Sequence, residues 1–392
     1  MAFEITRIGD ICKKVCSGGT PTSSNPDYYD GGIPWLNTNE VNFCNIYSTN
    51  KTISEEGLNH SAAKYIPVNS IIVAMYGVTA GKCAVAKIPL TTNQACCNLV
   101  IDEEKAHYQY VYHFLKLQSD NLNKLANGGA QQNLNSIIIK KFKIALPSLN
   151  IQQRIASILS AYDSLIENNN KRIRLLEQMA ENLYNEWFVR FRFPGHEKTE
   201  FENGLPKEWK FENLFAVADV SYGYAFKSDL FCNDESLNAV VRIRDIQDNH
   251  TKTYTSEICD DKYLIEENAI LVGMDGLFHM CLWNGERAYL NQRVVKINSK
   301  FENMCNFLLY MSIRPQIKFW EQVIAGTTVA HLGDKHLKKV KVIIPENELL
   351  VKANNTIQNL MVEKNRLFKQ NMLLSRQRDL LLPRLMSGKL EV

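Results

Sequence analysis

Apolar residues follow two different rhythms along this chain, and the change between them divides it into segments. Residues 1–147 carry short apolar runs between turns rich in Gly, Pro and Asn. Two of these runs, at residues 70–75 and 96–101, predict buried strands. Residues 108–125 predict a helix with one apolar face, and residues 137–146 predict a closing strand. The pattern therefore predicts a first globule of mixed α and β structure.

A helical rhythm begins at residue 151 and continues to about residue 190, with apolar residues every three or four positions. The end of the chain repeats this rhythm in heptads, and one row is Leu360, Leu367, Leu374 and Leu381. The companion row contains three polar residues and is Ile357, Lys364, Asn371, Arg378 and Leu385. Each helix has roughly 40 residues and a length of about 60 Å. A helix of that length with one apolar stripe needs a partner, so we expect the two helices to pair.

The two halves of the chain are predicted to be copies of one scaffold, because an offset of about 199 residues maps one onto the other. Residues 69–77 return as residues 268–276, and the Asn-Gln pair that starts at Asn93 returns at Asn291. The copies keep Gly, Pro, Asn-Gln and the apolar rhythm, whereas the residues between them differ. The repeat has the size of a whole domain. It suggests one scaffold with two recognition surfaces of different specificity.

The order globule, long helix, globule, long helix predicts an α+β fold. Two similar globular domains are separated by two long antiparallel coiled-coil helices and related by a pseudo-two-fold axis. We expect polar seam residues, among them Asn169, Lys364 and Asn371, to fix the register at some cost in stability. Residues 193–206 predict a linker. The alternative is two unrelated helices, each docked on its own globule. The predicted boundaries are 1–147, 148–195, 196–347 and 348–392.

Composition is that of a folded soluble protein, with 45% hydrophobic and 22% charged residues in 392. We expect no membrane partner and a cytoplasmic location, because no apolar run reaches the ~18 residues of a membrane span and the N-terminus lacks a signal-peptide layout. The ten cysteines form no CxxC pair and no zinc spacing, which predicts reduced, mostly buried thiols. The net charge is only +3, so nucleic-acid binding would need local basic surfaces.

Catalytic motifs are scarce. The patterns GxGxxG, HExxH, GxSxG and the zinc-deaminase signature are absent from the sequence. So is the Asn-Pro-Pro-aromatic motif with which amino-methyltransferases grip their target base. Residues 77–83 resemble a phosphate loop but are one residue short and carry Cys83 where that loop has Ser or Thr. We therefore expect no catalytic residue, no metal and no cofactor in this chain.

The loops are the candidate functional elements, because matched places in the two copies carry polar side chains of different identity. Residues 17–25 form a loop that we expect to be flexible, with hydroxyl and backbone donors that suit phosphate. Asn, Gln, Arg and Lys read base edges in the major groove, and they recur in the other matched loops. An ordinary polar surface is the alternative for each loop, and a packing role is the alternative for His331. The candidate DNA-contacting residues are Ser17, Gly18, Gly19, Thr20, Asn37, Asn39, Tyr76, Thr79, Lys82, Gln131, Gln132, Asn133, Tyr222, Lys227, Arg242, Arg244, Asp275, His279, Arg293, Thr327 and His331.

Three segments resemble a known family. Residues 175–197, with Glu-Trp-Phe-Val-Arg-Phe at their centre, are similar to the central region of specificity subunits of type I restriction-modification systems. Ser17-Gly-Gly-Thr-Pro with Ile33-Pro-Trp, and the ending Leu382-Pro-Arg-Leu-Met-Ser-Gly-Lys, resemble the same subunits. The resemblance covers essentially the whole chain. The second copy departs from it, because Ser221-Tyr-Gly-Tyr-Ala-Phe-Lys stands in place of the Gly-Gly-Thr-Pro loop.

The resemblance implies a non-catalytic subunit with two target recognition domains, each of which reads one half of a bipartite, asymmetric double-stranded DNA target. It implies that the helices set the unread spacer and dock two methyltransferase subunits. S-adenosylmethionine is then expected in those partner subunits rather than in this chain. Motor/nuclease restriction subunits can complete such a complex.

Three alternatives stay open at this point. The chain could serve a methylation-only or phage-defence complex without restriction, and nothing in the sequence separates this from a restriction system. A self-contained two-domain enzyme is disfavoured because no methyltransferase motif is present. A coiled-coil scaffold without DNA contact is disfavoured by the matched Asn, Gln and Arg loops on both globules.

Overall fold

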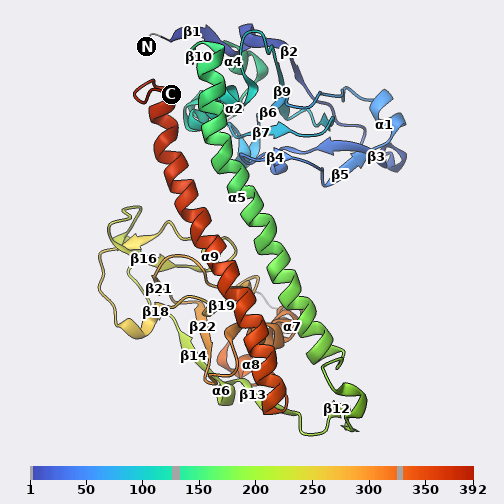
Figure 1. The fold of residues 1–392 in the computed structure, drawn as a ribbon, viewed down its shortest axis with the longest axis vertical. Coiled ribbons are helices and arrows are strands. Elements are labelled where there is room, and N and C mark those ends of the chain that lie inside the picture. Colours follow the sequence, from blue (N-terminus) through green and yellow to red (C-terminus); the bar gives the residue numbers. More distant parts are fainter. Residues whose placement is uncertain (1–2, 126–132, 325–329) are drawn as a thin grey trace. The chain divides into compact units, whose positions relative to one another are not determined.

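The computed structural model describes residues 3–125, 133–324 and 330–392, and the chain forms two compact units (Figure 1). Unit 1 contains Met1–Glu167 and Met372–Val392, and unit 2 contains Asn168–Asn371. Each unit combines sheets with helices, so the predicted α+β class is confirmed. Each unit also contains a part of both long helices.

The central sheet of unit 1 forms from the apolar runs predicted as strands. Its order is β2-β9-β6-β7-β4, and its neighbours are antiparallel except β4 and β7. The run in β6 is apolar throughout because both faces are covered. Ile71 and Val73 pack towards the helices, whereas Ile72 and Ala74 pack in a second cluster with Leu36. The strands are β2 (Cys12–Ser17), β4 (Asn45–Ile46), β6 (Ile71–Ala74), β7 (Cys83–Ala86) and β9 (Cys96–Ile101).

The rest of unit 1 surrounds this sheet. A smaller sheet has the order β5-β3-β8, in which β3 and β8 are parallel, and β1 pairs with β10 in a two-stranded ribbon. The strands are β1 (Glu4–Arg7), β3 (Tyr29–Leu36), β5 (Lys51–Ile53), β8 (Thr91–Thr92) and β10 (Lys143–Leu146). The helices are α1 (Glu55–Asn59), α2 (Tyr108–Leu117), α3 (Ser119–Lys124) and α4 (Ser136–Lys141).

Two predicted elements of unit 1 are wrong in detail. The single strand predicted at residues 137–146 is the helix α4 followed by β10. The side chain of Asn135 caps this helix by accepting hydrogen bonds from the backbone N–H groups of Ile137 and Ile138, at 3.0 and 2.9 Å. The predicted helix at residues 108–125 is interrupted at Gln118, which separates α2 from α3.

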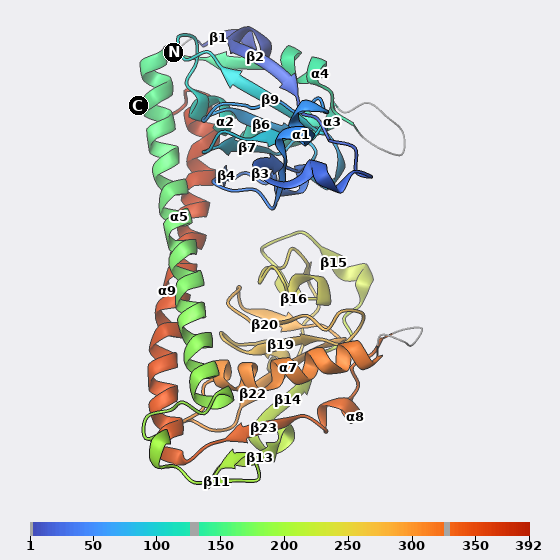
Figure 2. The same cartoon turned by 90° about the vertical axis from the view of Figure 1, so that its right-hand side faces the viewer.

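Unit 2 repeats the same plan. Its main sheet has the order β14-β22-β19-β20, and a second sheet has the order β15-β17-β16-β21-β18. Helix α7 packs against this main sheet (Figure 2). The main-sheet strands are β14 (Ala218–Tyr222), β19 (Ile270–Gly273), β20 (Met280–Leu282) and β22 (Val294–Ser299). The second-sheet strands are β15 (Phe231–Cys232), β16 (Asn238–Val241), β17 (Tyr254–Thr255), β18 (Leu264–Ile265) and β21 (Ala288–Leu290). The ribbon is β13 (Lys210–Asn213) with β23 (Lys341–Ile344), and the helices are α6 (Leu214–Val217), α7 (Asn306–Ile324) and α8 (Asp334–Leu337).

The order β2-β9-β6-β7 of unit 1 corresponds to β14-β22-β19-β20 of unit 2. The parallel pair β3·β8 likewise corresponds to β16·β21. Ile270 and Val272 pack towards α7, whereas Leu271 packs with Val241 and Trp283, which is the alternation seen in β6. The internal repeat predicted from the sequence is therefore confirmed at the level of topology and packing.

The predicted linker at residues 193–206 is folded. Its hairpin pairs β11 (Phe201–Glu202) with β12 (Leu205–Pro206) through Asn203 and Gly204, whose φ angles are 53° and 80°. Asn-Gly is the preferred pair for a two-residue turn that needs two positive φ angles. The buried ring of Phe193 stacks on Trp209, with ring centroids 5.2 Å apart.

The long helices are α5 (Leu149–Tyr184) and α9 (Asn347–Met386), which lie side by side in Figures 1 and 2. In unit 2, Asn371 donates to the Asn170 side chain at 2.8 Å, and Lys364 pairs with Glu177 at 3.1 Å. From the first pair to the second, the residue on α5 lies seven positions later in the sequence and the residue on α9 lies seven positions earlier. This spacing is that of an antiparallel heptad pair, as predicted. Buried Asn169 also donates to Asn371, at 2.9 Å.

Unit 1 contains the next polar pair of the same spacing, Asp163 with Arg378 at 2.6 Å. Both side chains are largely buried, with exposed fractions of 21% and 12%. Lys116 and His113 of α2 approach the same carboxylate, at 3.9 and 3.8 Å. Burial lowers the pKa of His113 to about 4, so its imidazole is neutral near pH 7 and Arg378 supplies the nearest countercharge. This cluster connects α2, α5 and α9 within unit 1.

We predict that Arg378→Met destabilises unit 1. The substitution removes the cation nearest to the largely buried Asp163 carboxylate and leaves only the more distant Lys116 to balance its charge. The free energy of unfolding should fall by about 1–3 kcal/mol, less than for a fully buried pair because water reaches part of the site. Urea denaturation measures this loss, and hydrogen exchange should locate it in the end of α9. The control is Arg376→Met, an exposed arginine on the same helix. Equal losses for the two variants would contradict a structural role of the ion pair.

Candidate nucleic-acid interface

The candidate loops of unit 1 start where the parallel strands β3 and β8 end. After Leu36 the chain makes a turn, and the backbone N–H groups of Asn37 and Asn50 donate to the two carboxylate oxygens of Glu40, at 3.0 and 2.9 Å. The N–H of Asn93 donates to the carbonyl of Leu36 at 3.0 Å, which holds the two strand ends together. Polar residues 37–39 and 93–94 are therefore brought to one edge.

Unit 2 builds the same edge with other side chains. The N–H of Arg242 donates to Asp245 at 2.9 Å, and the N–H of Asn291 donates to the carbonyl of Val241 at 3.1 Å. Asn37 thus corresponds to Arg242, and Asn39 to Arg244.

A third loop is held to this edge by one methionine in each unit. The N–H of Met75 donates to the carbonyl of Ala95 at 2.8 Å, and the carbonyl of Met75 accepts from the N–H of Leu134 at 3.0 Å. In unit 2, the N–H of Met274 donates to Arg293 at 2.9 Å, and its carbonyl accepts from Leu332 at 2.7 Å. Three segments thus meet at the end of β6 or β19 by the same backbone bonds.

The polar side chains at this edge of unit 1 contact one another. Asn93 donates to Asn37 at 3.2 Å, and the hydroxyl of Thr20 donates to Gln94. Asn39 and Asn133 are exposed. Tyr76, which follows Met75, is 40% exposed. The structure therefore brings Thr20, Asn37, Asn39, Tyr76 and Asn133 to the region of the three loops.

Gly18 and Gly19, in the loop at residues 17–25, have a structural role, so the prediction that their backbone N–H groups suit phosphate is wrong. Gly18 and Gly19 are buried, and their N–H groups donate to the carbonyls of Cys96 and Thr92 at 3.3 and 2.9 Å. A Cβ on Gly18 would lie 2.1 Å from the Thr92 carbonyl oxygen, so no side chain fits there. These N–H groups are thus not available to a phosphate, although Ser17 is exposed at the end of β2.

Gly223 is the counterpart of Gly18 in unit 2. Its N–H donates to Val294 at 3.1 Å, and a Cβ there would lie 2.0 Å from the Asn291 carbonyl oxygen. The departure noted in the sequence of the second copy therefore concerns the following residue, where Tyr224 stands in place of Gly19. The close approach at the first glycine is common to both units.

Lys82 and His279 are matched residues that directly precede β7 and β20. The carbonyl of Lys82 accepts from Ala74, and the carbonyl of His279 accepts from Gly273, both at 2.9 Å. The Lys82 ammonium donates to Asn42 at 2.8 Å, and the His279 ring contacts Gln247 at 3.1 Å. Lys82 also lines an open groove of about 790 Å³ that contains Lys116 and Arg378. The prediction that Thr79 contacts DNA is wrong, because its side chain is buried and its hydroxyl donates to the carbonyl of Thr38 at 2.9 Å.

We call the place where the segments around Met274, Arg293 and Leu332 are joined by backbone hydrogen bonds the three-loop edge of unit 2, and its counterpart around Met75 the three-loop edge of unit 1. In unit 2, the side chains of Asp275, Arg293 and His331 meet there. His331 Nδ1 lies 2.7 Å from Asp275 Oδ1, and Arg293 Nε lies 3.6 Å from Asp275 Oδ2. Tyr222 at the end of β14 donates to Asp334 at 2.9 Å, and burial first, then this carboxylate, raises the pKa of its hydroxyl.

The remaining candidates of unit 2 differ in exposure. Arg242 lies over the Phe231 ring at 5.4 Å, and exposed Arg244 donates to Thr253 at 3.4 Å. The side chain of Lys227 is exposed, and its backbone N–H donates to Glu257 at 3.0 Å.

Some candidates cannot be placed and others were missed. Gln131, Gln132 and Thr327 lie outside the described residues. The polar residues that the structure adds to these edges are Asn42, Asn93, Gln94 and Gln247. The Asn-Gln pair of the sequence repeat was the signal for two of them.

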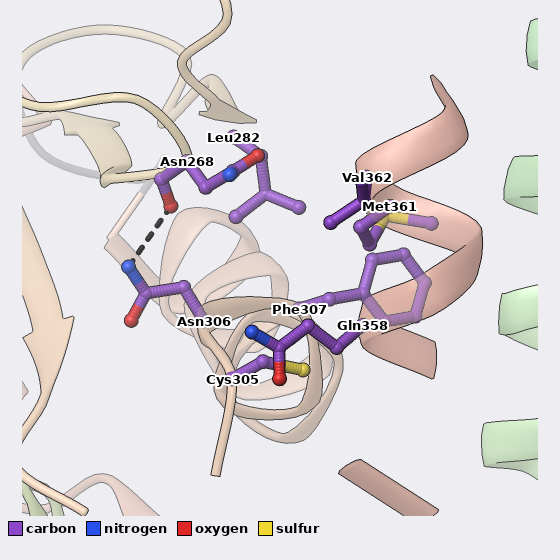
Figure 3. Close-up of a pocket in the computed structure, with 8 residues that line it drawn as sticks. All are labelled: Asn268, Leu282, Cys305, Asn306, Phe307, Gln358, Met361 and Val362. Carbon is purple, nitrogen blue, oxygen red and sulfur yellow. Dashed lines mark hydrogen bonds between the residues drawn. The ribbon is translucent and has the colours of Figure 1, made fainter. Parts of the chain in front are cut away.

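Unit 2 contains a second, smaller concavity of about 170 Å³ between α7 and α9 (Figure 3). It is mainly apolar, and the amide of Asn306 donates to the carbonyl of Asn268 at its rim, at 3.0 Å. The sulfur at its wall is Cys305, and burial raises the pKa of this thiol above its ordinary value. The lining residues are Asn268, Leu282, Cys305, Asn306, Phe307, Gln358, Met361 and Val362.

The described part of the chain contains neither a cluster of metal ligands nor a helix that could cross a membrane. Residues 3–125, 133–324 and 330–392 contain no group of three or more His, Cys, Asp or Glu side chains placed to hold a metal ion. Within the same ranges, no helix has the length and apolar character needed to cross a membrane.

The chain is similar to proteins of known family. The S subunit of a type I restriction-modification system from M. genitalium has a crystal structure that matches with a TM-score of 0.61 over 98% of this chain and 96% of that one. At 16% identity this likeness shows the fold alone. The type I restriction enzyme MjaIX specificity subunit of Methanocaldococcus jannaschii is 27% identical over 415 residues, which cover 100% of this chain and 94% of the relative.

Another relative has a higher sequence identity over a shorter stretch of the chain. The type I restriction enzyme EcoR124I/EcoR124II specificity subunit of Escherichia coli is 32% identical over 168 residues, or 41% of each chain. A family model described as the type I restriction modification DNA specificity domain matches twice, at residues 2–178 and 206–363. These two matches span most of the chain and agree with the internal repeat. The resemblance inferred from the sequence is therefore confirmed, and this protein belongs to the type I restriction-modification DNA specificity family.

Proposed function

We propose that this chain reads a bipartite DNA target for a type I restriction-modification complex, with one half-site read by each three-loop edge. The observation that carries the proposal is the pair of edges itself. The backbone bonds of Met75 and Met274 are the same, whereas the side chains around them differ. A common frame with different donors and acceptors suits two readers of different base sequence.

The chain would act without chemistry of its own. Its sequence lacks the Asn-Pro-Pro-aromatic motif of amino-methyltransferases and a complete phosphate loop. We propose that two methyltransferase subunits dock on it and carry S-adenosylmethionine, and that motor/nuclease restriction subunits join where the system restricts. A methylation-only or phage-defence complex would use the chain in the same way. A self-contained enzyme is the competing function.

The first experiment identifies the target. The chain is co-expressed with its methyltransferase subunits, and the modified bases of the host DNA are located by methylation-sensitive sequencing. We expect one motif with two specified halves and an unspecified spacer, and no modification when this chain is omitted. A single uninterrupted motif would contradict the two-reader proposal. Methyl transfer by the rigorously purified chain with S-adenosylmethionine would favour a self-contained enzyme.

We predict that Asn39→Ala and Arg244→Ala each weaken the reading of a different half-site. Both residues are exposed and lie in matched one-turn helices, Thr38–Glu40 in unit 1 and Ile243–Asp245 in unit 2. A lost base contact should cost about 1–3 kcal/mol at its own base pair. Competition binding by the assembled complex, with duplexes altered in one half at a time, measures this cost. Each variant is the control for the other, and equal losses on cognate and random DNA would place these residues away from base edges.

The helix pair is the proposed ruler for the spacer. Its polar contacts, such as Asn170 with Asn371 and Glu177 with Lys364, repeat every seven residues. Such contacts oppose sliding of one helix along the other, because a shift by less than a heptad would leave polar groups against apolar ones. Insertions that keep the contacts in phase should therefore change the length without changing the pairing.

We predict that inserting one heptad into each helix lengthens the spacer. The insertions belong between Asp163 and Asn170 on α5 and between Asn371 and Arg378 on α9, so that the polar pairs on both sides are kept. Seven residues add about 10 Å of helix, which is close to three base pairs. Sequencing of modified DNA should then show the same half-sites with a longer spacer.

The matched control carries the insertion in α5 only. It should disrupt the helix pairing and reduce assembly with the methyltransferase subunits. An assembled double-insertion complex that still modifies the original spacing would show that the helices do not set it.

A further inference from the structure

Asp275, His331 and Arg293 form a triad of charged or titratable side chains at the surface of unit 2. Their side chains are 31%, 41% and 56% exposed, so the triad is open to a large ligand while its members contact one another. The Asp275 carboxylate lies between the other two groups. Each residue comes from a different one of the three loops.

The backbone holds the triad in place. Asp275 and His331 form an antiparallel bridge, which is continued by the N–H of Gly276 donating to the carbonyl of Ala330 at 3.1 Å. The carbonyl of Arg293 accepts from Met274 at 2.9 Å. The contact between the imidazole and the carboxylate is thus anchored by backbone hydrogen bonds, as a recognition element requires.

The backbone at Arg293 has a φ of 72°, in the left-handed region. This conformation is costly for a residue with a Cβ, and glycine or asparagine adopts it more readily. Backbone strain of this kind gathers at functional sites. The arginine side chain that accompanies it lies beside Asp275.

The matched places in unit 1 lack this chemistry. The residues there are Tyr76, Asn133 and Ala95, as the shared backbone bonds of Met75 and Met274 establish. None of them carries a charge near neutral pH. The triad is therefore a property of one reader and not of the common scaffold.

We propose that His331 is a DNA-contacting residue that donates a hydrogen bond from Nε2 to an acceptor atom of DNA, and that Asp275 is the positioning residue that orients it. This inference rests on the proposed function. Because Asp275 accepts a hydrogen bond from Nδ1, that nitrogen keeps its proton, and Nε2 is the nitrogen that gains or loses one. A protonated Nε2 is both a donor and part of a cation. Arg293 adds further donors beside it.

The chemistry of the ligand follows from these donors. The major-groove edge of guanine presents two acceptors, N7 and O6, and the phosphate group presents acceptor oxygens. Both sources share the acceptor chemistry, and they differ in whether the contact depends on base sequence. The experiment below separates them.

Binding to such an acceptor should take up a proton, because it favours the protonated Nε2. The affinity for DNA should therefore rise as the pH falls, by up to about tenfold per pH unit for one proton. Histidine is the side chain whose charge ordinarily changes between pH 5 and 8. A change of affinity in this range is the signature that a merely structural contact would not give.

The other charged groups around His331 are Asp275 and Arg293 in the loops, and Asp334, Lys335 and His336 in and beside α8. Hydrogen bonds from Lys338 and Tyr222 hold the pKa of Asp334 below its ordinary value. Burial, Lys335 and Lys339 lower the pKa of His336, whose Nδ1 accepts from the backbone N–H of Gly333 at 3.1 Å.

The test measures binding of fluorescent duplexes by the assembled complex between pH 6 and pH 8. The duplexes are the target found by sequencing, the same target with either half scrambled, and a random duplex. The variants are His331→Asn, which introduces the residue type of the matched place in unit 1, and Asp275→Asn, which keeps the size of the side chain. His336→Asn, at the neighbouring imidazole, is the matched control. Size-exclusion chromatography checks that every variant assembles.

For the wild type we expect severalfold tighter binding to the target at pH 6 than at pH 8. His331→Asn should remove this dependence, Asp275→Asn should move it to lower pH, and His336→Asn should leave it unchanged. If the loss in His331→Asn requires an intact second half-site, the acceptor is a base edge. If the loss is equal on all duplexes, the acceptor is a phosphate.

A His331→Asn complex with the pH profile and discrimination of the wild type would overturn the proposal. An Asp275→Asn complex with the wild-type profile would overturn the positioning role alone. Failure of the proposed function is distinguishable from both, because the wild-type complex would then bind target and random duplexes equally at every pH.

Discussion

The backbone hydrogen bonds of one methionine in each unit are the constraint on which the candidate interface depends. Met75 and Met274 each use their N–H and their carbonyl to join two other loops to the end of a buried strand. The strand is rigid because both of its faces are covered by core side chains. The loops therefore present their side chains from a fixed backbone, and the identity of these side chains is left free.

In the long helices, by contrast, the polar side chains themselves fix the geometry. Asn169, Asn170 and Asn371 exchange amide hydrogen bonds in the seam, where apolar residues would pack with more freedom to slide. In unit 1, the Asp163 carboxylate joins Arg378 to the buried end of α2. Register is thus specified by hydrogen-bond partners, and burial of the apolar stripe supplies the bulk of the stability.

Features with a local or periodic cause could be predicted from the sequence. The buried strands, the heptad seam and the repeat each follow from the spacing of apolar residues or from self-similarity. The strand predicted at residues 137–146 failed because the cap provided by Asn135 outweighed the β propensity of three isoleucines. The loop with Gly18 failed for a different reason, since its close approach to Thr92 is a contact distant in sequence. The meeting of Asp275, Arg293 and His331 is equally non-local, and no spacing rule could indicate it.

The separation between frame and side chains has a consequence for how such a protein acquires new specificity. Exposed side chains such as Asn39 and Arg244 contribute little to folding, so their replacement leaves the margin above the stability threshold almost intact. Mutations of this kind can accumulate without selection against misfolding. The glycine at position 18 and its counterpart Gly223 have no such freedom, because any Cβ there collides with the backbone. New specificity in this fold can therefore arise by substitution of exposed loop side chains, whereas the backbone beneath them does not tolerate change.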